Sequence, residues 1–181
     1  MTPDFDKIRE INPKSFQRYL EIEKRVFETD VAADPDFQRL FSGFYRVRRN
    51  KKWRTAYFAL FEQMKKADKL SFSAVATALF KETGRVEASF SSKMLATIDP
   101  GFPIWDKYVL LNLGLKVPPR TGAEKLAAVI GLYDRMADWY ADFLKTEDAR
   151  RLLTLFDEKY PDLKRKLSAV KKIDFFIWSI R

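Results

Sequence analysis

The sequence predicts an all-α fold: one orthogonal multi-helix domain over residues 1–181, with about eight or nine helices. Apolar residues recur at helical spacing along most of the chain, and no alternating run of strand length is joined to hairpin turn residues. Only six glycines and eight prolines occur, and the prolines lie between the periodic segments. With 46% hydrophobic residues, a chain of this length can bury one sizeable core, although a joint near 116–121 would divide it into two lobes.

The first half of the chain contains four predicted helices. The pairs Asn12-Pro13 and Asp34-Pro35 each place a capping side chain before a proline, which favours the first turn of a helix. The first helix is expected to reach about Glu28, with Phe27 on its apolar side. A shorter helix over 72–80 is expected to close near Gly84. Between these helices lies the clearest apolar stripe: Trp53, Ala56, Tyr57, Leu60, Phe61 and Met64.

The second half of the chain predicts four or five more helical elements. A turn at 99–101 separates a helix rich in small residues, 88–96, from a short helix that ends at Gly114. Thr121 and Glu124 have the spacing of a capping box, which predicts the start of a long helix. Two further elements follow, a helix over 146–160 and an apolar tail over 171–181 that is expected to dock on the body.

The composition excludes several kinds of chemistry. The chain has no cysteine and no histidine, so disulfides, thiolate nucleophiles, histidine bases and histidine-based triads are impossible. Catalysis would have to come from Asp, Glu, Lys, Tyr, Ser or Thr. No Gly-rich phosphate loop occurs, and we expect no cofactor. A magnesium site made only of carboxylates stays open on composition, but no residues are assigned to a metal.

The location and the partners follow from the charge and from the missing apolar segments. The first residues, MTPDFDKIRE, include acids and no apolar run, and no segment approaches the ~20 apolar residues that span a bilayer. We therefore expect a cytoplasmic protein that does not insert into a membrane. The net charge of +9, with a pI near 9.6, favours an anionic partner. Charge alone does not choose between DNA or RNA and an acidic protein.

A run of cations between two predicted helices is the first candidate site. It contains six cations in the nine residues from 46 to 54, without an acid. Such a run can clamp phosphates, and the flanking Tyr45 and Trp53 can stack on unpaired bases. The alternative is a solvated helix junction with Trp53 turned into the core, which is the favoured placement for Trp53. The candidate nucleic-acid contacts are Arg46, Arg48, Arg49, Lys51, Lys52 and Arg54.

A second basic zone lies near the C-terminus, and an exposed segment between helices is its favoured interpretation. If it lies beside the first run, the two would form one basic surface. Its members are Lys164, Arg165, Lys166, Lys171 and Lys172.

Asp106 and Lys93 are the candidate reactive residues. Asp106 follows an apolar Pro-Ile-Trp at the start of a short helix, so an N-cap is favoured and a catalytic carboxylate in a cleft is the alternative. Lys93 lies among small and apolar residues; extension to solvent or to an acid is favoured over a buried amine that acts as a nucleophile or base. Tyr45, Lys93 and Trp105 are supporting candidates for the same site.

Three short motifs carry a resemblance to known proteins. The central motif, 89–115, reads SFSSKMLATIDPGFPIWDKYVLLNLGL, and the others read FYRVRR at 44–49 and KKIDFFIW at 171–178. Together they resemble a broad family of uncharacterised bacterial and phage proteins with an SSK, DP and PIWD pattern. The resemblance covers most of the chain in outline and implies the fold more than an activity.

The central motif is also distantly similar to the helix-hairpin-helix DNA glycosylases. Gly84, the 88–96 stretch and the 103–106 turn follow the order of that family's hairpin, small-residue helix and Pro-Val-Asp turn. The resemblance implies that Asp106 corresponds to the catalytic aspartate, which stabilises cationic sugar character during base release. The sequence departs from the family in the glycines of the hairpin, in Tyr108 where a histidine often follows, and in the lyase-type lysine. The missing lysine argues against strand cleavage.

These observations favour a nucleic-acid-binding helical domain, related in scaffold to the DNA glycosylases. If the protein is an enzyme, the resemblance implies a monofunctional base-excision hydrolase that uses Asp106. The alternative is a non-enzymatic interaction protein of a phage or defence locus, which binds a partner protein and has no role on nucleic acid. An exposed aromatic patch would favour this alternative, and a cleft with Asp106 at its floor and cations on its rim would favour the enzyme.

Overall fold

The computed structural model describes residues 11–179, which contain nine α-helices and no strand, so the predicted all-α class is confirmed. None of the described helices is both long and apolar enough to cross a membrane. A 3-10 helix, η2 (Pro161–Leu163), precedes the last helix. The α-helices are α1 (Pro13–Arg25), α2 (Pro35–Tyr45), α3 (Lys51–Met64), α4 (Phe72–Thr83), α5 (Ala88–Ile98), α6 (Lys107–Asn112), α7 (Gly122–Phe143), α8 (Glu147–Lys159) and α9 (Ala169–Ser179).

Capping side chains start the helices where the sequence predicted them, with one exception. Asn12 accepts a hydrogen bond from the backbone of α1, and Asp34 accepts two from α2. Thr121 is the N-cap residue of α7, but its side chain accepts no capping hydrogen bond, so the predicted capping box does not form. The physical reason lies in the next residue, because Gly122 has a φ of 53°. This left-handed backbone departs from the geometry on which a capping box depends.

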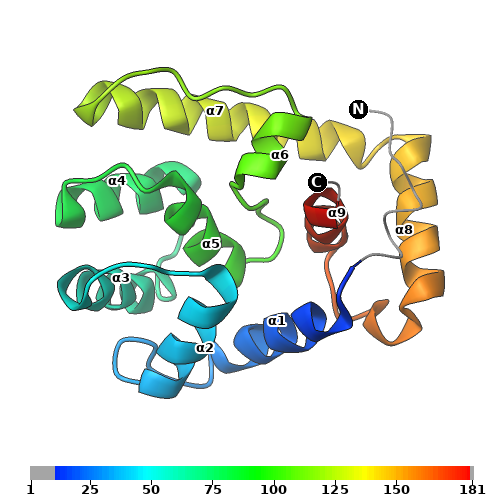
Figure 1. Ribbon diagram of the computed structural model, residues 1–181, viewed down its shortest axis with the longest axis horizontal. Helices are drawn as coiled ribbons and strands as arrows, with labels where there is room; N and C mark the ends of the chain where they lie inside the picture. The colour runs from blue at the N-terminus through cyan, green and yellow to red at the C-terminus, as the bar shows by residue number, and fades with distance from the viewer. Residues whose placement is uncertain (1–10, 180–181) are drawn as a thin grey trace.

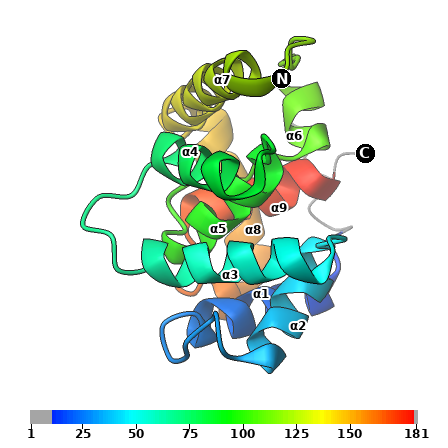
Figure 2. The same cartoon turned by 90° about the vertical axis from the view of Figure 1, so that its left-hand side faces the viewer.

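Two helices form the interior of the molecule, and the other helices surround them (Figure 1). Every residue of α5 from 90 to 98 and every residue of α9 from 170 to 177 is buried. A helix that is buried all round lies inside a core rather than on its surface. Helix α5 contacts α1 and α4, and α9 contacts α6 and α8. Figure 2 shows α7, α4 and α3 stacked in that order on one side of the molecule.

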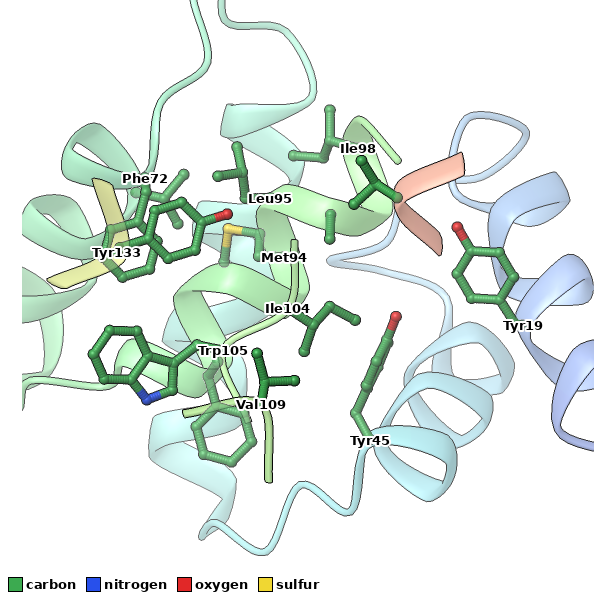
Figure 3. Packing of buried hydrophobic residues seen from close by; sticks show 14 of the residues in the cluster. Tyr19, Tyr45, Phe72, Met94, Leu95, Ile98, Ile104, Trp105, Val109 and Tyr133 are labelled. Carbon is green, nitrogen blue, oxygen red and sulfur yellow. The ribbon is translucent and has the colours of Figure 1, made fainter. Parts of the chain in front are cut away.

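Aromatic rings fill the space between the helices and the segment that precedes α6. The rings of Phe72 on α4 and Tyr133 on α7 stack with their centroids 3.8 Å apart. Figure 3 shows Trp105 beside this pair and Ile104 facing Tyr45. The buried hydrophobic residues form one continuous cluster that runs from α1 to α9. The segment that leads to Asp106 therefore packs inside the core and does not lie on its surface.

The prediction for the end of the first helix was wrong, and the prediction for the docking of the C-terminal tail is confirmed. The first helix stops at Arg25 rather than near Glu28, and Phe27 is 60% exposed instead of lying on an apolar face. The fully buried residue at the end of this helix is Val26 instead of Phe27. The apolar tail docks as expected, because Phe175 and Phe176 are buried. Residues 180–181 of the predicted tail lie outside the described residues.

The Asp34 cap gives a pH-dependent prediction. The pKa of the Asp34 carboxyl is lowered to about 2, chiefly by the backbone N–H of Phe37, with Thr29 and Arg25 also donating to it. A carboxylate with a lowered pKa stabilises the folded state above its unfolded pKa, and the contribution is lost as the pH falls through its folded pKa. We expect Asp34→Asn to lower the Tm at pH 6, and the gap from the wild type to close between pH 4 and pH 2, as measured by circular dichroism. A gap that stays constant over this range would contradict the assignment.

Candidate functional site

A cleft of about 850 Å3 opens between α1, α2, α5 and the start of α6. Its lining comes from segments that are far apart in the chain, including the N-terminal turns of α1 and Trp178 near the end of α9. All three sequence motifs contribute to it: residues 44–46 from the first, Ser89, Lys93 and the 105–106 pair from the second, and Trp178 from the third. The fold thus brings the three motifs to one place.

The cleft is strongly basic. Lys14 and Arg18 lie one turn apart on α1, so both side chains project from the same face of that helix. The remaining cations come from α2, α5 and α6. Five lining side chains carry positive charge and one carries negative charge, Asp106; the cations are Lys14, Arg18, Arg46, Lys93 and Lys107. Aromatic residues complete the lining: Phe44, Tyr45, Trp105, Tyr108 and Trp178.

Arg46 occupies an unusual position at the end of α2. Its φ of 54° makes it the only non-glycine residue in the left-handed region among residues 11–179. This conformation costs roughly 1–2 kcal/mol for a residue with a Cβ atom. The left-handed backbone of Arg46 turns the chain sharply after Tyr45. The exposed side chain of Arg46 then lies at the cleft. Strained non-glycine residues of this kind cluster at binding sites.

Asp106 caps a helix and lines the cleft at the same time. Its Oδ1 atom accepts a hydrogen bond of 2.9 Å from the backbone N–H of Tyr108, which makes it the N-cap of α6. The carboxylate is half-buried and belongs to the cleft lining. The two placements that the sequence left as alternatives are therefore combined in one residue.

The segment that carries Asp106 is fixed by hydrogen bonds from three helices. The Tyr133 hydroxyl of α7 donates to the Pro103 carbonyl at 2.8 Å. The backbone N–H of Trp105 donates to the Ser92 hydroxyl of α5 at 2.9 Å. The Ile104 N–H points to the Asp174 carboxylate of α9 at 3.5 Å. These hydrogen bonds fix residues 103–105, which lead into α6. The position of Asp106 in the cleft thus depends on the core.

Lys93 is buried, contrary to the expectation that it extends to solvent or to an acid. Only 9% of it is exposed, and its Nζ atom lies 3.4 Å from the Tyr45 carbonyl, over the rings of Tyr45 and Phe90. No carboxylate lies within 4.0 Å of Nζ among the described residues. Burial lowers the pKa of the Lys93 ammonium, and the charge of Asp106 partly opposes this shift. Glu87, the N-cap residue of α5, pairs instead with Arg49 and Arg85.

The guanidinium of Arg49 is paired with an acid of the protein. Its guanidinium makes two hydrogen bonds to Glu87, at 3.1 and 2.9 Å, and lies over the rings of Trp53 and Phe90. The Glu87 side chain is only 8% exposed, so the pair is an internal structural contact. Trp53 is buried, as the favoured interpretation expected. Tyr45 is buried too, which leaves neither flanking ring free on the surface to stack on a base.

The other cations of the run stay at the surface. They lie around the start of α3, and we call them the basic junction: Arg48, Lys51, Lys52 and Arg54. All four side chains are exposed. The basic junction follows Arg46 directly in the chain, so the cleft and this surface share one stretch of backbone.

The second basic zone divides into exposed and buried residues. Lys164, Arg165 and Lys166 are exposed, as expected. Lys171 and Lys172 are buried and form ion pairs with Asp174 and Asp157, so their placement on a basic surface was wrong. Both lysines belong to α9, which is buried on all sides, and a buried ammonium is costly unless it is paired with a carboxylate.

Four residues of the cleft lining were not among the individual candidates from the sequence. Lys14, Arg18, Lys107 and Trp178 line the cleft together with the predicted Arg46, Lys93 and Asp106. The spacing of Lys14 and Arg18 on one helix face was a usable signal, but nothing in the sequence placed that face opposite Asp106. Among residues 11–179, no group of three or more Asp and Glu side chains gathers in a way that could hold a metal ion.

Comparisons of the chain with protein-family models, curated proteins and solved structures found no match. The resemblances based on the three motifs therefore stay predictions.

Proposed function

We propose that the cleft binds nucleic acid, with its exposed cations on the phosphates and its aromatic residues near the bases. The observation that carries this proposal is the composition of the lining, in which five cations meet one acid and the half-buried rings of Phe44, Tyr108 and Trp178 in one concave site of about 850 Å3. Lysine and arginine neutralise phosphates and release counterions, while rings offer apolar surface to bases. A site for an acidic protein would not need this aromatic content.

The surface around the cleft supports the same proposal. Arg46 lies at the cleft, and the basic junction continues from it over the start of α3. A strand that leaves the cleft on this side would meet four more exposed cations. Phosphate contacts outside a binding pocket add affinity without sequence preference. The proposed footprint is therefore the cleft together with the basic junction.

The alternative of a protein-interaction surface has less support. Three large hydrophobic residues are exposed among residues 11–179, namely Phe27, Leu111 and Val117. They lie on different segments, and one of them is aromatic. A partner-binding surface is more often a contiguous apolar patch.

The placement of Asp106 favours a second candidate, a base-excision hydrolase. A carboxylate that lines a basic cleft can stabilise positive charge on a sugar during base release. Asp106→Asn keeps the helix cap and removes the negative charge. In that candidate, the variant still binds DNA but no longer releases bases, as measured by cleavage of alkali-treated oligonucleotides that carry damaged bases. No release by the wild-type protein on such a panel would remove this candidate.

The first experiment measures binding of fluorescent oligonucleotides across a salt series. We expect micromolar affinity that falls linearly on a log–log plot against salt. Lys14→Ala/Arg18→Ala should reduce the slope by about 1.4–1.8, because each lost phosphate contact accounts for about 0.7–0.9.

The matched control is Lys24→Ala/Lys81→Ala, which removes two exposed cations that do not line the cleft. This control should leave the slope close to that of the wild type. No binding even at low salt, or equal slopes for the two double variants, would contradict the proposal.

A further inference from the structure

We infer that the cleft takes an unpaired nucleotide, so that the protein binds single strands and unpaired positions in preference to intact duplex. This inference rests on the proposed function and names the class of nucleic acid that the site selects. It is carried by the unused hydrogen-bonding capacity of Lys93 and Asp106 at the cleft wall.

Lys93 has more donors than the protein uses. An ammonium carries three N–H donors, and the one acceptor recorded for Nζ is the Tyr45 carbonyl at 3.4 Å, which is a long hydrogen bond. The side chain is nine-tenths buried, so bulk water reaches it poorly. Buried donors are normally satisfied. Lys93 thus lines a cleft in which a ligand can supply the missing acceptor.

Asp106 supplies the complementary group. Its Oδ1 atom is engaged by the backbone of α6, and no hydrogen bond or ion pair is recorded for Oδ2 within the described part of the chain. The negative charge of Asp106 acts on Lys93, yet the two groups do not form an ion pair within 4.0 Å. One wall of the cleft therefore offers a donor and an acceptor that do not satisfy each other.

Such a donor and acceptor match the edge of a nucleobase. Every base presents at least one donor and one acceptor on its Watson–Crick edge, and in a duplex the opposite base occupies that edge. Only an unpaired base leaves it free for Lys93 and Asp106. Because all four bases meet this requirement, the expected selectivity is for unpaired nucleotides and not for a sequence.

The size of the cleft agrees with this selection. A volume of about 850 Å3 lies in the range of pockets that hold small ligands and cofactors. It accommodates a nucleotide or a short segment of one strand. The two strands of an intact duplex would stay outside the cleft, in reach of exposed cations such as Lys14 and Arg18.

The test compares four fluorescent oligonucleotides in the same buffer by anisotropy: single-stranded DNA, single-stranded RNA, the matched DNA duplex, and that duplex with one bulged nucleotide. The single strands are expected to bind at least tenfold tighter than the duplex, with the bulged duplex between them. Lys93→Met and Asp106→Asn should each reduce the preference to less than threefold while the salt slope stays that of the wild type. Asp106→Asn retains the cap but can present an amide donor where the carboxylate accepted.

Stability measurements separate this role from a structural one. Lys93→Met removes a buried ammonium that has no carboxylate partner, so its Tm should equal or exceed that of the wild type. Lys65→Met is the control, because Lys65 is another largely buried lysine but is paired with Glu62 outside the cleft. It should lower the Tm and keep the strand preference. Equal affinity for duplex and single strands would overturn the inference and leave the proposed function standing; no binding to any of the four would overturn both.

Discussion

Replacing Asp174 with leucine is expected to lower the free energy of unfolding by about 3–5 kcal/mol, because it leaves a buried charge without its partner. Asp174 and Lys171 are each 2% exposed at the side chain, and their charged atoms lie 2.9 Å apart. The change also removes the acceptor for the Tyr140 hydroxyl, which donates to Asp174 at 2.8 Å. Urea unfolding at pH 7, followed by circular dichroism, measures the loss.

The double variant Lys171→Met/Asp174→Leu tests the cause of that loss. With neither charge left in the core, most of the stability should return, as it does when buried ion pairs are replaced by apolar residues. The Tyr140 hydroxyl still lacks its acceptor, so a deficit of about 1–3 kcal/mol should remain. If the double variant were as unstable as Asp174→Leu, the buried charge would not be the cause.

The ion pair between Asp157 of α8 and Lys172 of α9 provides the matched control. Asp157 is 19% exposed, so its loss leaves Lys172 closer to water and should cost less than the loss of Asp174. The Asp157 carboxylate accepts from Lys172, whereas the Asp174 carboxylate also receives the Ile104 N–H of the 103–106 segment. We expect Asp174→Leu to weaken oligonucleotide binding and Asp157→Leu to leave it unchanged. Equal binding losses would show that general destabilisation explains both.

The helix starts could be predicted from the sequence because they depend on neighbouring residues. An Asn or Asp before a proline fixes the first turn by a local hydrogen bond and a preset backbone angle, as at Asn12 and Asp34. Thr121 shows the limit of this reasoning. Its spacing to Glu124 correctly predicted where α7 begins. The positive φ of Gly122, however, is a property of the folded chain and prevents the capping hydrogen bond.

The cations were harder to place, because a lysine is exposed or buried according to partners elsewhere in the fold. Lys171 and Lys172 were placed on a surface, although both lie in the core. The Asp174 partner was visible three residues from Lys171, but Asp157 belongs to another helix. The burial of Lys93 was missed in the same way, since no sequence pattern shows that Tyr45 and Phe90 cover it.

Part of the cleft lining was singled out from the sequence, and part of it was missed. Arg46, Lys93, Trp105 and Asp106 were singled out from residue type and local setting, and all four line the cleft. The cations of α1 were missed because their role depends on how α1 packs against the rest of the core. The side chains of Phe16 and Tyr19 set this packing through edge contacts with Phe175 of α9. Such a contact joins residues that are separated by most of the chain.

Arg48 and Arg49 are neighbours in the sequence, and we expect opposite results from their substitution. Arg49→Ala should lower the free energy of unfolding by about 2–3 kcal/mol, because it removes two charge-assisted hydrogen bonds and leaves the buried Glu87 carboxylate with Arg85 alone. Arg48 is exposed, and Arg48→Ala should change the stability by less than about 0.5 kcal/mol. Urea unfolding of the two variants measures this difference.

Oligonucleotide binding should show the reverse order. Arg48 belongs to the basic junction, so its loss should weaken binding and lower the slope of the log–log salt plot by about 0.7–0.9. The guanidinium of Arg49 is occupied by Glu87, so Arg49→Ala should leave the salt slope unchanged at temperatures where the variant is folded. A change in slope for Arg49→Ala would mean that this ion pair opens to meet phosphate. Such a result would extend the footprint inward from the basic junction to Glu87 and the start of α5.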